Sequence, residues 1–132
     1  MKRLICIAYS SVFILSVLFV AFTCEDKNYN EVLLTNLSND TICVFSSHDE
    51  AMIERSLNDS QLLSLWQNIS PKETRSIHFV SEHDNILHVV VLKRHTFETT
   101  LINENIDSIK FDKRYILTLE QLGNINYNIK YH

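Results

Sequence analysis

The chain has 132 residues, a formal net charge of −4, one glycine, one proline and three cysteines. This length is enough for one domain around one hydrophobic core and too short for two. The acidic balance makes nucleic acid an unexpected partner, and the sequence has no Gly-rich phosphate loop, nucleophile elbow or His-Glu-x-x-His helix that would predict an enzyme or a cofactor.

The N-terminus has the features of an export signal. Lys2 and Arg3 supply a positive start, and Leu4 to Phe22 is an almost unbroken apolar run. A polar chain begins directly after Cys24, so the pattern predicts a secretory signal that ends at a cysteine. The segment Val20-Ala21-Phe22-Thr23-Cys24 resembles the loose lipobox of small lipoproteins from the Bacteroides group. That resemblance implies that Cys24 becomes the mature N-terminus and carries acyl chains such as palmitate.

The domain boundaries follow from this signal. We expect a signal peptide over residues 1–23, a tether over residues 24–28 and a single domain over residues 29–132. Several acyl chains hold a protein on a bilayer, so a lipidated cysteine predicts attachment to the membrane. Glu25-Asp26 resembles the acidic signal for export to the outer membrane or cell surface in that bacterial group. An uncleaved single-span anchor facing the periplasm and an ordinary soluble secreted product are the alternatives.

The first half of the domain begins with extended segments. Tyr29 to Thr35 and Thr41 to Ser47 are rich in β-forming residues and enclose a polar turn, which predicts a hairpin. From Met52 to Trp66 the apolar residues recur at three- and four-residue spacing, which predicts one or two helical turns. Pro71 ends any helix because the residue before a proline is pushed out of the α region.

The middle of the chain contains the expected centre of the core. Arg75 to Phe79 is extended, and a polar turn separates it from Ile86 to Leu92. The second segment is apolar on both alternating faces, as expected of a central strand that is covered on both sides. After it come Thr99 to Ile102 and a short helical candidate at Glu104 to Ile109.

The last twenty residues alternate most regularly. Tyr115, Leu117 and Leu119 share one face of a predicted strand, and Gln121 to Asn124 supplies a turn. From Ile125 to Tyr131 every odd position is apolar or aromatic, which predicts a half-solvated antiparallel strand. The fold class expected from these elements is mainly β, an antiparallel β-sandwich of Ig-like general architecture with one or two short helical inserts, preceded by a signal helix.

The C-terminal half also carries a family resemblance. Lys113 to Leu122, followed by Asn126 to Tyr131, is similar to the KRY-x-LT-x-E-x-L and N-aromatic-x-I-x-Y ending of small uncharacterised lipoproteins from Bacteroides and its relatives. The run Ile86 to Thr99 and the segment Asn105 to Ile109 resemble their apolar strand and short helix. In many relatives, tryptophan stands where this chain has Ile106 and Tyr127. The resemblance implies an exported β-rich domain and brings no catalytic residue.

Several side chains are candidates for ligand or metal binding. Exposed aromatic rings on a sandwich stack on sugars, and the candidates for such contacts are Trp66, Tyr127 and Tyr131, although packing inward is the stronger interpretation for all three. The candidate metal ligands are His78, His83 and His88. His78 and His88 would have to meet across adjacent strands, and a histidine on a strand is more often simply packed.

Two further features concern single residues. Asp40-Thr41-Ile42 and Asp107-Ser108-Ile109 resemble the O-glycosylation triplet of exported Bacteroides-group proteins, which makes Thr41 and Ser108 candidate acceptors. Cys43 lies in an apolar strand and is left without a partner once Cys24 is acylated, so we expect a buried, inert thiol.

The sequence therefore predicts a membrane-anchored lipoprotein that is a non-catalytic structural or binding component of the bacterial envelope. A surface module that binds glycan or protein is the alternative, and a hydrolase is a distant one.

Overall fold

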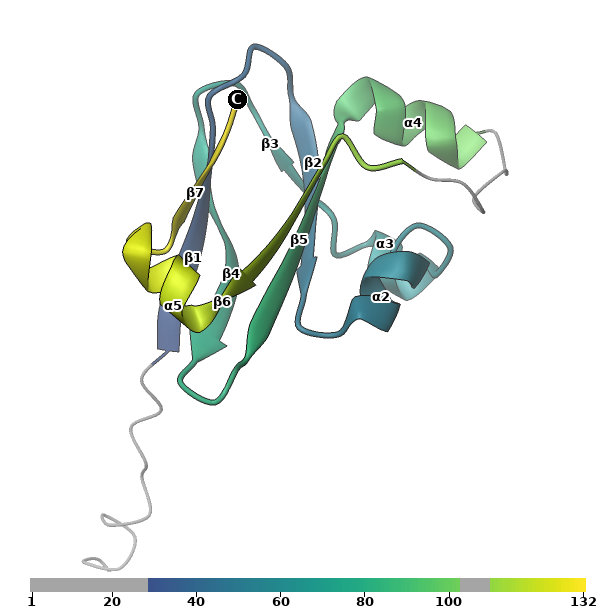
Figure 1. The fold of residues 1–132 in the computed structure, drawn as a ribbon. Coiled ribbons are helices and arrows are strands. Elements are labelled where there is room, and N and C mark those ends of the chain that lie inside the picture. The colour runs from purple at the N-terminus through teal and green to yellow at the C-terminus, as the bar shows by residue number, and fades with distance from the viewer. Residues whose placement is uncertain (1–28, 103–109) are drawn as a thin grey trace, which may run out of the picture.

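The computed structural model describes residues 29–102 and 110–132 (Figure 1). The signal peptide, Cys24, Ser108 and the helical candidate at 104–109 lie outside them. The strands are β1 (Tyr29–Asn36), β2 (Ile42–Ser47), β3 (Gln67–Ile69), β4 (Thr74–Ser81), β5 (Ile86–Lys93), β6 (Lys113–Thr118) and β7 (Asn128–Tyr131). The helices are α2 (Glu50–Arg55), α3 (Ser60–Leu63), α4 (Arg94–Ile102) and α5 (Leu119–Asn124).

The strands form two facing sheets, which confirms the predicted mainly β sandwich. One sheet has the order β4-β1-β7 and the other β3-β2-β5-β6. All pairs are antiparallel except β1 with β7, which is parallel. Lettered in chain order, the sheets read D-A-G and C-B-E-F, whereas an immunoglobulin constant domain has A-B-E-D and C-F-G. The layered architecture is shared with that fold, and the connections between strands are different.

The helices α2, α3 and α4 lie beside the four-stranded sheet, on the side away from the other sheet (Figure 1). This arrangement explains the uniformly apolar strand β5. Leu87, Val89 and Val91 face the main core between the two sheets. Val90 faces the helices and packs in a second, smaller cluster with Ile53. The prediction that this strand is central and covered on both faces is therefore confirmed.

The expected hairpin between the first two strands does not form, because β1 and β2 belong to different sheets. Asn36, the last residue of β1, is fully buried. Its Nδ2 donates to the carbonyl oxygens of Asp40, Ile69 and Ser70 at 2.8, 3.1 and 3.2 Å. Its Oδ1 accepts from Ser38. This network turns the chain from one sheet to the other, so the polar stretch that resembles a hairpin turn is a crossover between layers.

The C-terminal segment differs from its prediction in two respects. Leu119–Asn124 is helix α5 and not a turn after a strand, because Thr118 and Gln121 form a capping box. The strand β7 begins only at Asn128 and runs parallel to β1. Asn126 and Tyr127 have positive φ angles of 50° and 55°, so the alternation before Asn128 belongs to a tight turn.

The segment Thr99 to Ile102 forms the end of helix α4. Across residues 29–102 and 110–132, none of the helices has the length and apolar character required to cross a membrane.

Candidate functional site

A groove of about 520 Å³ opens between strands β6 and β7. These are edge strands of opposite sheets, since β6 pairs only with β5 and β7 only with β1. The two sheets are therefore not joined by strand pairing on this side of the sandwich. The residues that line the groove come from β6, from the turn after α5 and from β7: Tyr115, Leu117, Ile125, Asn126, Asn128, Ile129 and Lys130.

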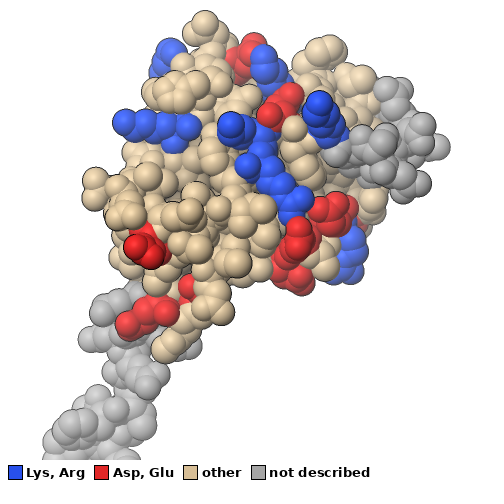
Figure 2. Space-filling model, in the orientation of Figure 1, with Lys and Arg blue, Asp and Glu red and all other residues tan. Residues whose placement is uncertain are grey.

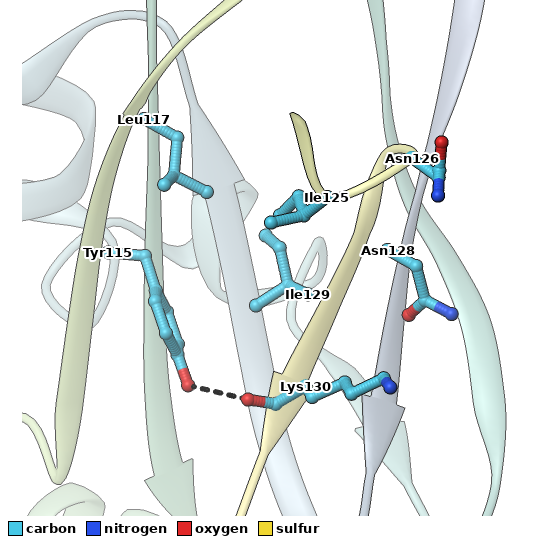
Figure 3. A pocket seen from close by; sticks show the side chains of 7 residues that line it. All are labelled: Tyr115, Leu117, Ile125, Asn126, Asn128, Ile129 and Lys130. Carbon is cyan, nitrogen blue, oxygen red and sulfur yellow. Dashed lines mark hydrogen bonds between the residues drawn. The ribbon is translucent and has the colours of Figure 1, made fainter. Parts of the chain in front are cut away.

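The walls of the groove are apolar. Figure 3 shows Tyr115 and Leu117 of β6 facing Ile125 and Ile129 across the space, with the amides of Asn126 and Asn128 turned away from it. Leu117 and Tyr115 also pack against the main core, which the buried Ile129 belongs to. The groove is thus a solvent-accessible extension of the main core, on the side of the sandwich where the edge strands β6 and β7 do not pair.

Two polar groups remain inside this apolar space. The Tyr115 hydroxyl donates to the carbonyl oxygen of Lys130 at 3.3 Å and so links the two sheets (Figure 3). Burial raises the pKa of the Tyr115 hydroxyl, and the neighbouring Tyr131 adds to the rise. The phenol therefore stays neutral near pH 7 and acts as a hydrogen-bond donor.

The backbone of β7 also presents hydrogen-bonding groups to the groove. The carbonyl oxygens of Tyr127 and Tyr131 accept from Leu33 and Leu37 of the β1 side. Because backbone groups alternate along a strand, the N–H and C=O of Lys130 point the opposite way, toward β6. The groove therefore combines apolar walls with an open strand edge.

The turn after α5 fixes one wall of the groove. The N–H of Tyr127 donates to Leu122 at 2.8 Å, and its carbonyl accepts from Leu33 at the same distance. These bonds hold the residue in its left-handed conformation, which is unfavourable for a large side chain. Ile125, which precedes Tyr127 in this turn, lines the groove and is 40% exposed.

The three predicted aromatic ligands do not form a common surface. Trp66 packs between Phe45 and Phe97, with ring centroids 5.7 and 5.1 Å away, and its Nε1 donates to the carbonyl oxygen of Ser56 at 3.1 Å. Tyr131 is buried in the main core. Tyr127 packs against that core as well, and its hydroxyl bonds to the Asn30 side chain. The inward-packing interpretation agrees with this arrangement.

The three predicted metal ligands are also apart. His78 lies on β4 and His88 on β5, and these strands belong to different sheets, so the expected contact across adjacent strands does not exist. His88 is buried and its Nδ1 has no hydrogen-bond partner, while His83 is exposed in the turn between the two strands. Among the residues that the structure describes, no group of three or more His, Cys, Asp or Glu side chains is placed to hold a metal ion.

A different histidine pair, which the sequence did not suggest, joins the sheets near the β4–β5 turn. The rings of His48 and His78 meet edge to face at 4.7 Å. His48 Nε2 lies 3.5 Å from Asp84 Oδ2, and the His78 Nδ1 lies 3.1 Å from the Ser46 hydroxyl. Burial lowers the pKa of His78, and the charge of His48 lowers it further. A sequence signal for this pair is absent because His48 and His78 come from separate segments of the chain.

Thr41 and Cys43 lie close together at the start of β2. Thr41 is half-buried, and its carbonyl oxygen accepts from the N–H of Arg94 at 3.0 Å. Cys43 is a buried free cysteine whose thiol donates to Asn68 at 3.1 Å. Burial raises the pKa of this thiol to about 11, which agrees with the predicted inert character.

No protein-family model, curated protein or solved structure matches this chain.

Proposed function

We propose that the chain is an exported lipoprotein, anchored through Cys24, whose β-sandwich is a non-catalytic binding module of the bacterial envelope. The N-terminal pattern supports the anchor. The observation that supports the binding role is the groove between β6 and β7. An apolar groove with few polar groups suits ligand binding, and apolar surface left open beside a core is unfavourable unless something covers it.

The ligand that this groove fits best is an extended segment of another protein. Extended segments bind by adding a strand to an open sheet edge, with main-chain hydrogen bonds for affinity and pockets for alternate side chains. The Lys130 backbone offers such bonds, and the walls at Leu117 and Ile129 accept apolar side chains. A glycan is a weaker candidate because Trp66 and Tyr131 are held inside the fold.

The anchor is tested by the intact mass and membrane partition of the exported protein beside a Cys24→Ala variant. We expect the wild type to lack residues 1–23, to carry acyl mass and to stay with the membrane, and the variant to be released. Retention of residues 1–23 in both proteins, with both in the membrane, contradicts the lipoprotein and supports the single-span anchor.

The groove is tested with displayed libraries of short peptides, selected on the membrane-anchored protein. Selected peptides are expected to lose roughly tenfold or more in affinity for Ile125→Glu, because a carboxylate at the mouth of an apolar groove opposes burial of their side chains. Leu65→Glu is the matched control, since Leu65 is also an exposed apolar residue but lies after α3. Equal binding to both variants, or selection of no peptides, contradicts the proposal.

A further inference from the structure

The groove between β6 and β7 has an apolar end and a polar end. Leu117 and Ile125 line the end that lies toward α5. Tyr115 and Lys130 line the other end, nearer the start of β6, and the Tyr115 hydroxyl meets the Lys130 backbone there. A segment that lies along the groove therefore meets different chemistry at its two ends.

Lys113 adds a positive charge to the polar end. Side chains two residues apart on a strand point to the same face, so Lys113 leaves β6 on the side of Tyr115 and Leu117. Its ammonium lies 5.8 Å from the centroid of the Tyr115 ring, a distance at which a cation is attracted to an aromatic face. Because that ring lines the groove, the ammonium lies at the mouth of the groove.

Two acidic residues on the same side of the sandwich already have partners. Asp112 Oδ2 accepts from the backbone N–H of Lys93 at 2.6 Å. Asp40 Oδ2 lies 2.8 Å from the Lys93 ammonium. Lys113 itself forms no ion pair with any carboxylate of residues 29–102 or 110–132. Its charge is therefore available to a bound partner.

Two further hydrogen-bond donors lie at the polar end. The Lys130 N–H points from the free edge of β7 toward β6, because the residues on either side of it pair with β1. Figure 3 shows the Lys130 side chain turned away from the groove, so only its backbone takes part. The other donor is the neutral Tyr115 hydroxyl. An ammonium, an N–H and a hydroxyl together suit a carboxylate, which accepts several hydrogen bonds and carries the opposite charge.

The surrounding surface has the same sign of charge. In Figure 2, basic side chains lie over β6 and across the upper part of the visible face, beside a broad stretch of uncharged surface. Glu50 and Glu54 of α2 are paired with Arg114 of β6. An acidic group that approaches this part of β6 is therefore attracted, over a range of about 8 Å at physiological salt.

We propose that the groove binds an extended protein segment with an acidic side chain, and that Lys113 holds this side chain at the polar end. The inference rests on the proposed binding role of the groove and adds the chemistry of the partner. Apolar side chains of the segment face Leu117 and Ile129, and its carboxylate reaches the Lys113 ammonium. Because side chains on one face of an extended segment recur at every second residue, the acidic residue lies two or four positions from an apolar one.

The test uses peptides selected from displayed libraries on the membrane-anchored protein. We expect them to contain Asp or Glu two or four positions from an apolar residue. A copy of each peptide with Asn or Gln in place of the acid should bind the wild type roughly fivefold more weakly. Lys113→Gln should weaken the acidic peptide by a similar factor and leave the amide copy unchanged, since both changes remove the same contact.

Two variants serve as controls. Lys72→Gln removes the charge of another exposed lysine, which lies between β3 and β4, the strands at the opposite side of the sandwich from β6 and β7. It should leave both affinities unchanged. Lys113→Arg keeps the charge and should restore most of the binding of the acidic peptide. Circular dichroism reports whether each variant is folded.

The outcomes separate the acidic contact from the groove itself. If the peptides lose affinity for Ile125→Glu but their acidic and amide copies bind equally, the groove stands and the contact with Lys113 is refuted. Equal effects of Lys113→Gln on both copies refute it as well. If no peptides are selected, or if they bind Ile125→Glu as tightly as the wild type, the proposed binding role fails and the acidic contact fails with it. Should Lys113→Gln misfold, the comparison of the two copies on Lys113→Arg and on the wild type still decides.

Discussion

At the residue scale, the Asn36 side chain connects separate segments of the chain. The residue is fully buried, and its amide bonds to three carbonyl oxygens that come from the first loop and from the β3–β4 turn. Its own backbone N–H donates to Glu73 and its carbonyl accepts from Lys72. One side chain thus satisfies the backbone at a point where three segments meet and regular pairing ends.

We expect Asn36→Ala to lower the free energy of unfolding by about 2–4 kcal/mol, because several buried carbonyl groups lose their donor at once. Urea unfolding followed by circular dichroism measures this loss. The matched control is Asn39→Ala, an exposed asparagine in the same loop, for which we expect less than about 0.5 kcal/mol. Similar losses in the two variants would show that the network does not stabilise the crossover.

A second prediction at this scale concerns His78 and pH. Burial and the nearby His48 lower the pKa of His78 below its usual value of 6.5. The unfolded chain therefore binds a proton more readily than the folded chain, so stability falls as the pH drops below about 6.5 and levels off below the folded-state pKa. The slope contributed by one such group is at most about 1.4 kcal/mol per pH unit.

Urea unfolding between pH 7.5 and 5 measures this dependence. His78→Gln is expected to flatten it, whereas His83→Gln, a change at an exposed histidine in the β4–β5 turn, is expected to preserve it. The pKa of Asp84 is lowered from its usual value of 3.8, chiefly by the hydrogen bond that its carboxylate accepts from the Ser81 N–H. Asp84 therefore affects stability only in a separate pH range, below 3.8. An unchanged slope in His78→Gln would assign the pH dependence to other groups.

At the element scale, helix α5 connects β6 to the turn that forms a wall of the groove. Its capping box is closed in both directions: Thr118 Oγ1 accepts from the Gln121 N–H at 3.3 Å, and Gln121 Oε1 accepts from the Thr118 N–H at 2.9 Å. We expect Thr118→Ala to lower the free energy of unfolding by about 1 kcal/mol, and Thr118→Ser to restore most of it. Urea unfolding of the three proteins provides the comparison, and equal losses for Ala and Ser would contradict a capping role.

Strand β5 and helix α5 show where prediction from sequence succeeds and where it fails. Strand β5 was predictable because a strand that is buried on both faces carries apolar residues at nearly every position. Helix α5 was not, since six residues are too short for a clear period and the alternation after Leu122 resembles a strand. The capping pair Thr118 and Gln121 is the local signal that would have identified it.

The groove could not be predicted for a different reason. Leu117 and Ile129 were both recognisable as apolar strand residues. No local feature of the sequence, however, indicates that their strands are edge strands of opposite sheets. That information lies in the pairing of β7 with β1, which are separated by most of the domain. The groove is a property of the topology, and a site of this kind becomes visible only when the pairing is known.

At the scale of the whole molecule, the two apolar clusters differ in size and protection. The main core joins both sheets, and β1, β2 and β5 all contribute fully buried residues to it. The smaller cluster attaches α2 and α3 to the outer face of one sheet through Phe45, Ile53, Leu62 and Val90. Arg114 adds ion pairs to Glu50 and Glu54 of α2, but both carboxylates are largely exposed and stabilise the contact only weakly.

Hydrogen exchange followed by mass spectrometry should therefore show a graded pattern. We expect the amides of β1, β2 and β5 to exchange slowest, at rates set by global unfolding, and those of α2 and α3 to exchange faster through local opening of the outer layer. Ile53→Ala removes most of a buried side chain from the smaller cluster and leaves a cavity there. It should therefore accelerate amide exchange in α2 and α3 more than in β1. Uniform acceleration across the domain would instead mean that the helices and both sheets unfold as one cooperative unit.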